Sequence, residues 1–271
     1  MLKRHQTRFA KMEEFIEKAE SLRGKHPEMG CRKMALKLKD KGFGRDKIEA
    51  LLLRSGFRIV YPPNYMKTTQ SVRIHQFGNL IKGLEIKEIN KVVQTDITYF
   101  RMNGGFGYLV FIIDVYSRLI VGYHASSSLE SVANMKALEM MIKLRERKNL
   151  KGLIHHSDRG LQYCSKLYTD YLKENHITIS MTENGDPYEN AIAERVNGIL
   201  KTELISNYYK DPVEASRHIS RCITIYNYRR RHASLNWQVP EEVHKQYGMQ
   251  KKTWRNYYYK RTKKQSTNAE N

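Results

Sequence analysis

The feature that most constrains the fold is a change of hydrophobic period near position 92. From Val92 to Met102 apolar and polar residues alternate, as in a strand with one buried face. Asn103-Gly104-Gly105 is typical of a hairpin turn, and a second, largely apolar strand is predicted over Phe106 to Asp114. A third strand, Leu119 to Ala125, follows the tight turn Tyr116-Ser117-Arg118. The segment predicts a three-stranded antiparallel meander.

Helices and strands alternate after this meander. We predict a helix over Glu130 to Lys148, a strand over Leu153 to His156, a helix over Ser165 to Asn175 and a strand over Ile177 to Met181. A two-faced helix follows the loop 182–187. The order βββαβαβα indicates an α/β fold in which a mixed five-stranded sheet carries helices on its faces.

Three helical patterns precede Gly56. The first runs from Arg8 to Leu22 and is stopped by Lys25-His26-Pro27. The apolar residues of the other two recur at helical spacing on either side of the turn Gly42-Phe43-Gly44; they are Cys31, Met34, Ala35 and Leu38, then Ile48, Leu51 and Leu52. The sequence therefore predicts a small, all-helical N-terminal module.

Helix, glycine turn and basic helix is also the layout of a helix-turn-helix, whose second helix would present Lys47 and Arg54 to a DNA major groove. Many small helical bundles share this layout and keep their charged face in solvent. We assign residues 1–60 to a DNA-binding module, 61–90 to a linker, 91–245 to a catalytic core and 246–271 to a basic tail.

The charge of the chain points to a polyanionic partner. Lys and Arg number 48 against 28 Asp and Glu, a formal net charge of +20, and phosphate contacts supply most non-specific affinity for nucleic acids. Basic ribosome-associated and membrane-surface proteins share this property. No apolar run of about 18 residues is present, and the three separated cysteines contain no C-x-x-C pair. We expect a cytoplasmic, nucleoid-associated protein that does not enter the membrane.

Two aspartates occupy positions that suit a site. Asp96 lies within the first strand, on the opposite face from Ile97 and Tyr99, and Asp158 falls where the fourth strand ends. A carboxylate inside a core strand is costly unless it is paired or bound to a cation, and ligands gather at the carboxyl ends of strands in α/β sheets. Taken singly, each aspartate is more often a cap or turn residue.

A third carboxylate lies on the helix after residue 187. Its polar face carries Asn190, Glu194, Asn197 and Lys201, and its apolar face carries Ile192, Val196 and Ile199. An ordinary amphipathic helix would look the same.

Three converging carboxylates would hold two divalent cations roughly 4 Å apart, an arrangement suited to phosphoryl transfer. Oxygen ligands favour Mg²⁺ or Mn²⁺. His155 and His156 have no third nitrogen or sulfur ligand nearby, which favours packing or substrate contacts over a zinc site.

Together these motifs resemble those of bacterial insertion-sequence transposases, and most closely the second-frame (OrfB-type) product of the family-three elements. The resemblance rests on Thr95 to Tyr99, on His156 to Gly160 with Gln162-Tyr163, and on Glu189 to Lys201. Between Asp158 and Glu194 lie 35 residues, the gap of the integrase-like D,D-35-E group, and a basic residue follows the Glu by seven.

Further similarity extends over residues 27–245. It includes Asp114, Ser117-Arg118, Tyr226-Asn227, Arg230, His232, Leu235 and Pro240. One departure is Val92-Val93, where the family often has an aromatic residue.

The resemblance implies a ribonuclease-H-like core and a transposase that processes element ends and joins them to target DNA through the 3′-hydroxyl. It implies that Asp96, Asp158 and Glu194 are the catalytic residues and ligate two Mg²⁺ ions, with Mn²⁺ as a substitute. The residues expected to contact DNA are Lys201, Asn190, Asn197 and Arg230, besides Lys47 and Arg54. Asp114, Asn190 and Arg230 are equally explained as buried residues that stabilise the fold.

The expected partners are the terminal repeats of the element, target DNA, further copies of the chain, and a protein encoded by an upstream frame. Two other classes of protein remain open. A retroviral-type integrase or a hydrolytic nuclease would use the same carboxylates, but the N-terminal region lacks a His-His-Cys-Cys module, and Asp114 is the only obvious fourth carboxylate for a ribonuclease. A non-catalytic DNA-binding regulator would not need the intact carboxylates.

Overall fold

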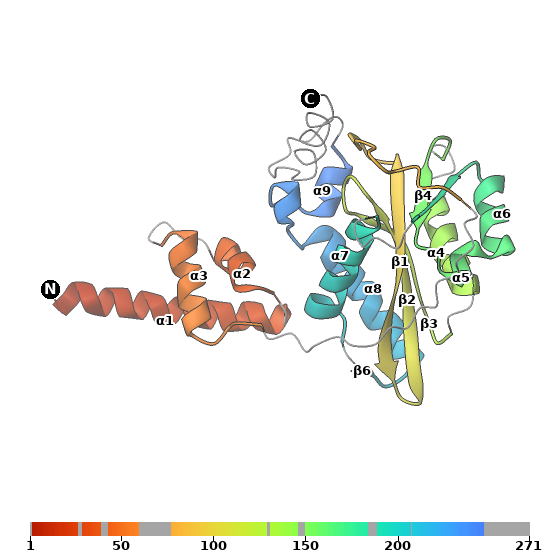
Figure 1. The fold of residues 1–271 in the computed structure, drawn as a ribbon. Helices are drawn as coiled ribbons and strands as arrows, with labels where there is room; N and C mark the ends of the chain where they lie inside the picture. Colours follow the sequence, from red (N-terminus) through yellow and green to blue (C-terminus); the bar gives the residue numbers. More distant parts are fainter. Residues whose placement is uncertain are drawn as a thin grey trace, which may run out of the picture.

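The computed structural model describes residues 2–26, 29–38, 43–59, 77–128, 131–145, 150–183, 189–206 and 208–246. The first part of the assigned linker, 61–76, and the assigned tail from 247 onward lie outside these residues, as does part of the expected turn at Gly42. Three N-terminal helices are followed by a sheet with helices on both faces (Figure 1).

The sheet confirms the predicted mixed topology. Its strand order is β3-β2-β1-β4-β5; β1 to β3 are antiparallel, and β4 and β5 run parallel to β1. The strands are β1 Val92–Met102, β2 Gly105–Asp114, β3 Ile120–Ser126, β4 Ile154–Ser157 and β5 Thr178–Met181. This is the ribonuclease-H-like arrangement of an antiparallel meander extended by parallel strands.

A sixth strand, β6 Tyr208–Tyr209, pairs with Arg101 and Met102 at the far end of β1. The prediction of five strands was therefore one short. Two residues are too few to produce an alternating pattern, and this pairing depends on a long-range contact.

The two faces of the sheet are covered by different helices (Figure 1). One apolar core lies against α4 Ser131–Leu144, α5 Leu161–Cys164 and α6 Lys166–Glu174. The other lies against α7 Ala191–Ile199 and α8 Pro212–Tyr228. Because β2 lies between β1 and β3 and is covered on both faces, all its residues from Leu109 to Asp114 are buried.

After α7 the chain continues in a π-helical turn, η1 Leu200–Leu204. The next helix, α8, begins with two favourable start signals: the Asp211 side chain accepts the N–H groups of Val213 and Glu214, and Pro212 occupies the first turn. The short helices η2 Ala233–Leu235 and α9 Pro240–His244 follow.

The N-terminal helices α1 Leu2–Lys25, α2 Cys31–Lys37 and α3 Arg45–Arg54 have an apolar core of their own. Its fully buried residues are Ala19, Met34, Ala35, Ile48 and Leu52. The first helix starts before the predicted Arg8, because polar residues extend a helix without adding to its apolar stripe. Lys47 and Arg54 are exposed, as the helical wheel predicted. None of the described helices combines the length and apolar composition needed to cross a bilayer.

The packing of α4 on the sheet depends on Gly122. A Cβ at this position of β3 would lie 2.2 Å from the carbonyl oxygen of Ala137 on α4. We expect Gly122→Ala to lower the free energy of unfolding in urea by about 1 to 3 kcal/mol, the usual cost of overpacking. Gly198→Ala is the matched control, because nothing lies within 4 Å of its added Cβ and alanine favours a helix. Equal stability of the two variants would contradict this packing.

Candidate active site

Asp96 lies on β1, and both of its carboxylate oxygens are held by hydrogen bonds. Oδ1 accepts the backbone N–H of Ile97 at 2.8 Å. Oδ2 accepts Nδ2 of Asn197, on α7, at 2.8 Å. The side chain therefore faces α7, and the carboxylate is fixed in one orientation by its own strand and by that helix.

Asp158 follows β4 directly and is held by a tight turn. Its Oδ1 accepts the backbone N–H of Gly160 at 3.0 Å. A Cβ at Gly160 would lie 3.0 Å from that same oxygen and 2.7 Å from Nε2 of Gln162, so a side chain at this position would crowd the carboxylate and displace the Gln162 amide. Burial raises the pKa of Asp158, although the Gly160 N–H and the charge of Arg159 act in the opposite direction.

The electrostatics of Asp96 connect the three predicted carboxylates. Burial is the largest cause that raises its pKa, to about 7, and the charges of Asp158 and Glu194 add to the increase. The hydrogen bonds from Asn197 and from the Ile97 N–H oppose it. Asp158 and Glu194 are thus close enough to Asp96 for their charges to act on it.

The carboxylates do not yet surround one point. Among the residues that the structure describes, no three His, Cys, Asp or Glu side chains form a group that could hold one metal ion. The hydrogen bonds of Asp96 and the exposed position of Glu194 on α7 are consistent with this spacing, because like charges separate unless a cation lies between them. Binding of a shared cation would bring the three carboxylates closer together.

Three amide side chains fasten α7 to β1. Gln94 is buried; its Oε1 accepts the N–H of Ala193 at 3.1 Å, and its Nε2 donates to the Glu189 carbonyl at 3.3 Å. Asn190 donates to the Thr95 carbonyl at 3.1 Å, and Asn197 donates to Asp96. These contacts bring Glu194 to the strand that carries Asp96.

For Asn190 and Asn197, which we expected to contact DNA, the structure thus favours a positioning role. Gln94 was missed by the sequence reasoning. A buried amide two residues before Asp96, on the same strand face, was the available signal.

The donor atoms present fit a hard divalent cation. Asp96 and Asp158 supply partly desolvated carboxylate oxygens, which a cation would stabilise. The amide oxygens of Asn190 and Asn197 are buried without a hydrogen-bond partner, so further oxygen donors lie at the contact between α7 and β1. The set contains no soft ligand, which argues for Mg²⁺ or Mn²⁺ chemistry.

Lys201 lies in the π-helical turn η1, which directly continues α7. Its Nζ lies 3.7 Å from the centre of the Tyr99 ring. Burial lowers the pKa of Lys201, while the charge of Asp96 raises it. The ammonium group therefore lies within electrostatic range of the carboxylate site.

The paired histidines beside Asp158 pack within the core. His155 Nε2 lies 2.9 Å from the Tyr168 hydroxyl, and His156 Nδ1 lies 2.8 Å from Ser180 Oγ. Burial lowers the pKa of His155 to about 3 and that of His156 to about 4, so both rings are neutral near pH 7. Both histidines therefore pack at the end of β4, as predicted from the sequence.

Asp114 has a structural position. It is fully buried, and its oxygens accept the N–H and hydroxyl of Ser117 and the N–H of Asn90, each at 2.8 Å. Arg145 Nη2 lies 3.5 Å from its Oδ2. These contacts fix the turn between β2 and β3 and leave Asp114 unsuited to act as the fourth carboxylate of a ribonuclease.

Arg230 is also committed to the fold. It is buried, and its guanidinium donates to both oxygens of Glu203, at 2.7 and 2.8 Å. Lys33, on α2, donates to the same carboxylate at 2.7 and 2.8 Å. The structure favours the stabilising role of Arg230 over a DNA contact. Glu203 was missed, because its partners are 27 and 170 residues away.

Two family models described as "Integrase core domain" match residues 87–187 and residues 175–240. The "Transposase for insertion sequence element IS629" of Shigella sonnei is 33% identical over 226 residues, which is 82% of this chain and 75% of that protein.

"Transposase InsF for insertion sequence IS3A" of Escherichia coli (strain K12) is 36% identical over 154 residues, 54% of this chain and 51% of that one. Among solved structures, the simian T-cell lymphotropic virus intasome in complex with a PP2A regulatory subunit is similar with a TM-score of 0.49 and 18% identity. That match covers 88% of this chain and 78% of the other.

Proposed function

The chain belongs to the insertion-sequence transposases with an integrase core, which move DNA segments, and from this premise we propose that Asp96, Asp158 and Glu194 are its catalytic carboxylates. The reaction is cleavage of the element ends and transfer of their 3′-hydroxyl groups to target DNA. The observation that carries the proposal is that Asp158 and Glu194 lie close enough to the half-buried Asp96 for their charges to raise its pKa.

The protein groups have distinct tasks in this proposal. Asp96, Asp158 and Glu194 would hold the divalent cations. When bound, the cations activate the attacking water or 3′-hydroxyl and stabilise the leaving oxygen. Asn197 and the Ile97 N–H orient Asp96, while Gln94 and Asn190 keep α7 against β1. Such pre-organisation keeps the carboxylates near the reacting phosphate.

The direct test is joining of a labelled duplex that carries the terminal repeat of the encoding element. We expect cleaved and joined products with Mg²⁺ or Mn²⁺ and none with EDTA. A joining reaction that proceeds equally in EDTA would overturn the proposed metal dependence. Cleavage without any joining would instead favour a hydrolytic nuclease.

We predict that Lys201→Ala reduces strand transfer at limiting DNA by about 10- to 100-fold. The expected loss is that of one hydrogen bond to a charged phosphate, about 1.5 to 3 kcal/mol. Thermal stability should fall by no more than about 1 kcal/mol, from the lost cation–π contact with Tyr99. Lys201→Arg is the control and should keep most activity. Joining by the alanine variant at the wild-type rate would assign Lys201 a packing role only.

We also propose that the N-terminal module contacts DNA through α3. Lys47→Ala combined with Arg54→Ala should weaken duplex binding and make its salt dependence shallower by about two units in the log–log slope. The control variant instead replaces two exposed residues by alanine, Lys143 on α4 and Arg217 on α8. If both double variants bind alike in fluorescence anisotropy, the module serves protein contacts.

Assembly as a homo-multimer on DNA, cooperation with a protein from an upstream frame, and a cytoplasmic, nucleoid-associated location stay predictions. The mass of the complex with a terminal repeat, measured by light scattering, tests the first of them. A complex with one chain per DNA end and no paired ends would contradict it.

A further inference from the structure

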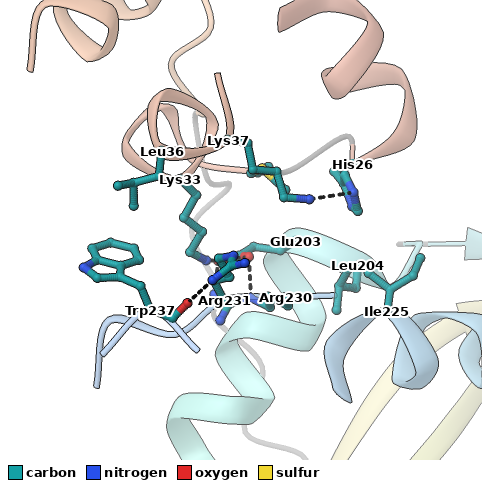
Figure 2. A pocket seen from close by; sticks show the side chains of 11 residues that line it. His26, Lys33, Leu36, Lys37, Glu203, Leu204, Ile225, Arg230, Arg231 and Trp237 are labelled. Atoms are coloured by element: carbon teal, nitrogen blue, oxygen red, sulfur yellow. Dashed lines mark hydrogen bonds and ion pairs between the residues drawn. The ribbon is translucent and has the colours of Figure 1, made fainter. Parts of the chain in front are cut away.

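A pocket lies between the N-terminal helices and the catalytic domain. Figure 2 shows α2 with Lys33 and Lys37 on one side, and Glu203, Arg230, Arg231 and Trp237 on the other. The two sides are joined by the Glu203 carboxylate, which binds Arg230 of the core and Lys33 of the module. This seam, the contact of α2 with residues 203–204 and 225–237, is thus a built interface between the two parts of the chain.

The seam carries more positive charge than its carboxylate can balance. Glu203 already serves two cations. Lys37, Arg229 and Arg231 are exposed, and within the described part of the chain none of them forms a salt bridge with a carboxylate.

Burial is the largest cause that lowers the pKa of Lys37, and the charges of Arg231 and Arg229 lower it further. Lys37 Nζ also lies 3.4 Å from Nε2 of His26, whose pKa is lowered by burial and by Lys37 and Arg229. Cations from both sides of the seam therefore repel one another, and an anion between them would relieve that repulsion.

Local structure fixes one of these cations at the pocket. Arg231 donates from Nη1 to the carbonyl of Trp237 at 2.9 Å. Asn236 and Trp237 both have positive φ, at 54° and 63°, a backbone conformation that is rare for a bulky side chain. The Trp237 N–H bonds to the His232 carbonyl at 2.8 Å. The turn thus holds the Arg231 guanidinium beside the half-buried Trp237.

The seam is also linked to the catalytic helix. Glu203 lies in the same π-helical turn as Lys201 and nine residues beyond Glu194. At about 1.5 Å per residue, the distance along this helix is roughly 13 Å. One DNA strand advances about 3.4 Å per nucleotide, so this distance corresponds to about four nucleotides.

We propose that the seam binds the phosphodiester backbone of the DNA whose end lies at the carboxylates, with Lys37 from the module and Arg231 from the core on either side. The inference rests on the proposed function for its choice of anion. The proposal assigns a DNA contact to Lys37 and Arg231, which the sequence motifs did not indicate. It also means that this DNA-binding surface forms only when the N-terminal module is docked on the core.

The test compares two double variants of the full chain. Lys37→Ala with Arg231→Ala removes the seam cations, and Lys143→Ala with Arg217→Ala removes the same charges from exposed positions outside it. Binding of a labelled terminal-repeat duplex is measured over a series of salt concentrations. The seam variant should have a log–log slope shallower by about two units, because two phosphate contacts are lost. A slope equal to that of the control variant would overturn the proposal.

A second readout uses Trp237, one of two tryptophans in the chain. In a Trp254→Phe background, the duplex should change the fluorescence of Trp237, and the seam substitutions should abolish that change. Binding that leaves Trp237 fluorescence unaffected also counts against the seam.

The two proposals fail separately. Suppose that the wild-type protein joins no ends in Mg²⁺ but the seam variant binds DNA with a shallower salt dependence than the control. The proposed catalysis then fails, and the proposed phosphate contact at the seam is supported. If joining proceeds and both double variants bind alike, the seam fails and the catalysis stands. Thermal unfolding of each variant should match that of wild type, since all four substituted side chains are exposed.

Discussion

Asp96→Asn, Asp158→Asn and Glu194→Gln are each expected to reduce cleavage and joining of element ends by at least about 10³-fold. Loss of an outer-shell partner of a metal costs about 10- to 100-fold, and loss of a ligand itself should cost more. A 10³-fold reduction corresponds to about 4 kcal/mol of transition-state stabilisation. The readout is joining of the labelled terminal repeat in Mg²⁺ under single-turnover conditions.

The folded state should tolerate these changes. Asparagine at position 96 can still accept the Asn197 amide through its carbonyl oxygen, and it removes a charge whose burial is unfavourable. DNA affinity and thermal unfolding are therefore expected to stay near wild type. Glu139→Gln, on the exposed side of α4, is the matched control and should keep full activity. Substantial joining by any one of the three variants removes that residue from the catalytic set.

The second large effect concerns stability. Glu203→Gln leaves the buried Arg230 and the half-buried Lys33 without their carboxylate, and breaking a buried pair by removing one partner costs about 3 to 5 kcal/mol. Glu14→Gln removes the partner of Lys18 in an exposed pair and should cost no more than about 1 kcal/mol. Urea denaturation measures both. Equal stability of the two variants would show that Glu203 is dispensable.

The same carboxylate predicts a pH dependence. Burial alone would raise the pKa of Glu203, but Arg230 and Lys33 outweigh burial and hold it below the usual 4.5. A folded-state pKa below the unfolded value means that this stabilisation is present above about pH 4.5 and is lost as the pH falls through the folded-state pKa. Glu203→Gln should lose this component of the acid dependence of unfolding.

Hydrophobic periodicity predicted the sheet well because its strands bury alternating or continuous apolar residues. The bounds of β1 agree with the prediction, since the turn at Asn103-Gly104 ends the alternating pattern. The helix predicted after β3, over 130–148, corresponds to α4 Ser131–Leu144; its predicted start and residues 146–148 lie outside the described residues.

Long-range polar contacts could not be predicted from one sequence. The amide contacts of Gln94, Asn190 and Asn197 join residues about 100 positions apart, and no local pattern encodes such a pairing. The π-helical turn at Lys201 was missed for a related reason. This turn packs against α8, and its Glu203 binds Lys33 of the N-terminal module. Such long-range contacts cannot be read from the helix propensity of the local sequence.

The three carboxylates were proposed from motif order and spacing. Asp96 and Asp158 stand where the topology brings β1 and β4 together. What the spacing could not give is their orientation: both oxygens of Asp96 are hydrogen-bonded and Glu194 lies on an exposed helix face. We therefore expect a bound cation to set the final orientation of these groups.

Crystals grown with a terminal-repeat duplex and Mn²⁺ test that point most directly, through the anomalous scattering of manganese. The account predicts manganese bound between the carboxylates of Asp96 and Asp158, with Glu194 turned toward it and oxygen ligands at about 2.0 to 2.6 Å. Manganese bound only elsewhere, with DNA in place and Asp96 still held by Asn197 and the Ile97 N–H alone, would contradict it.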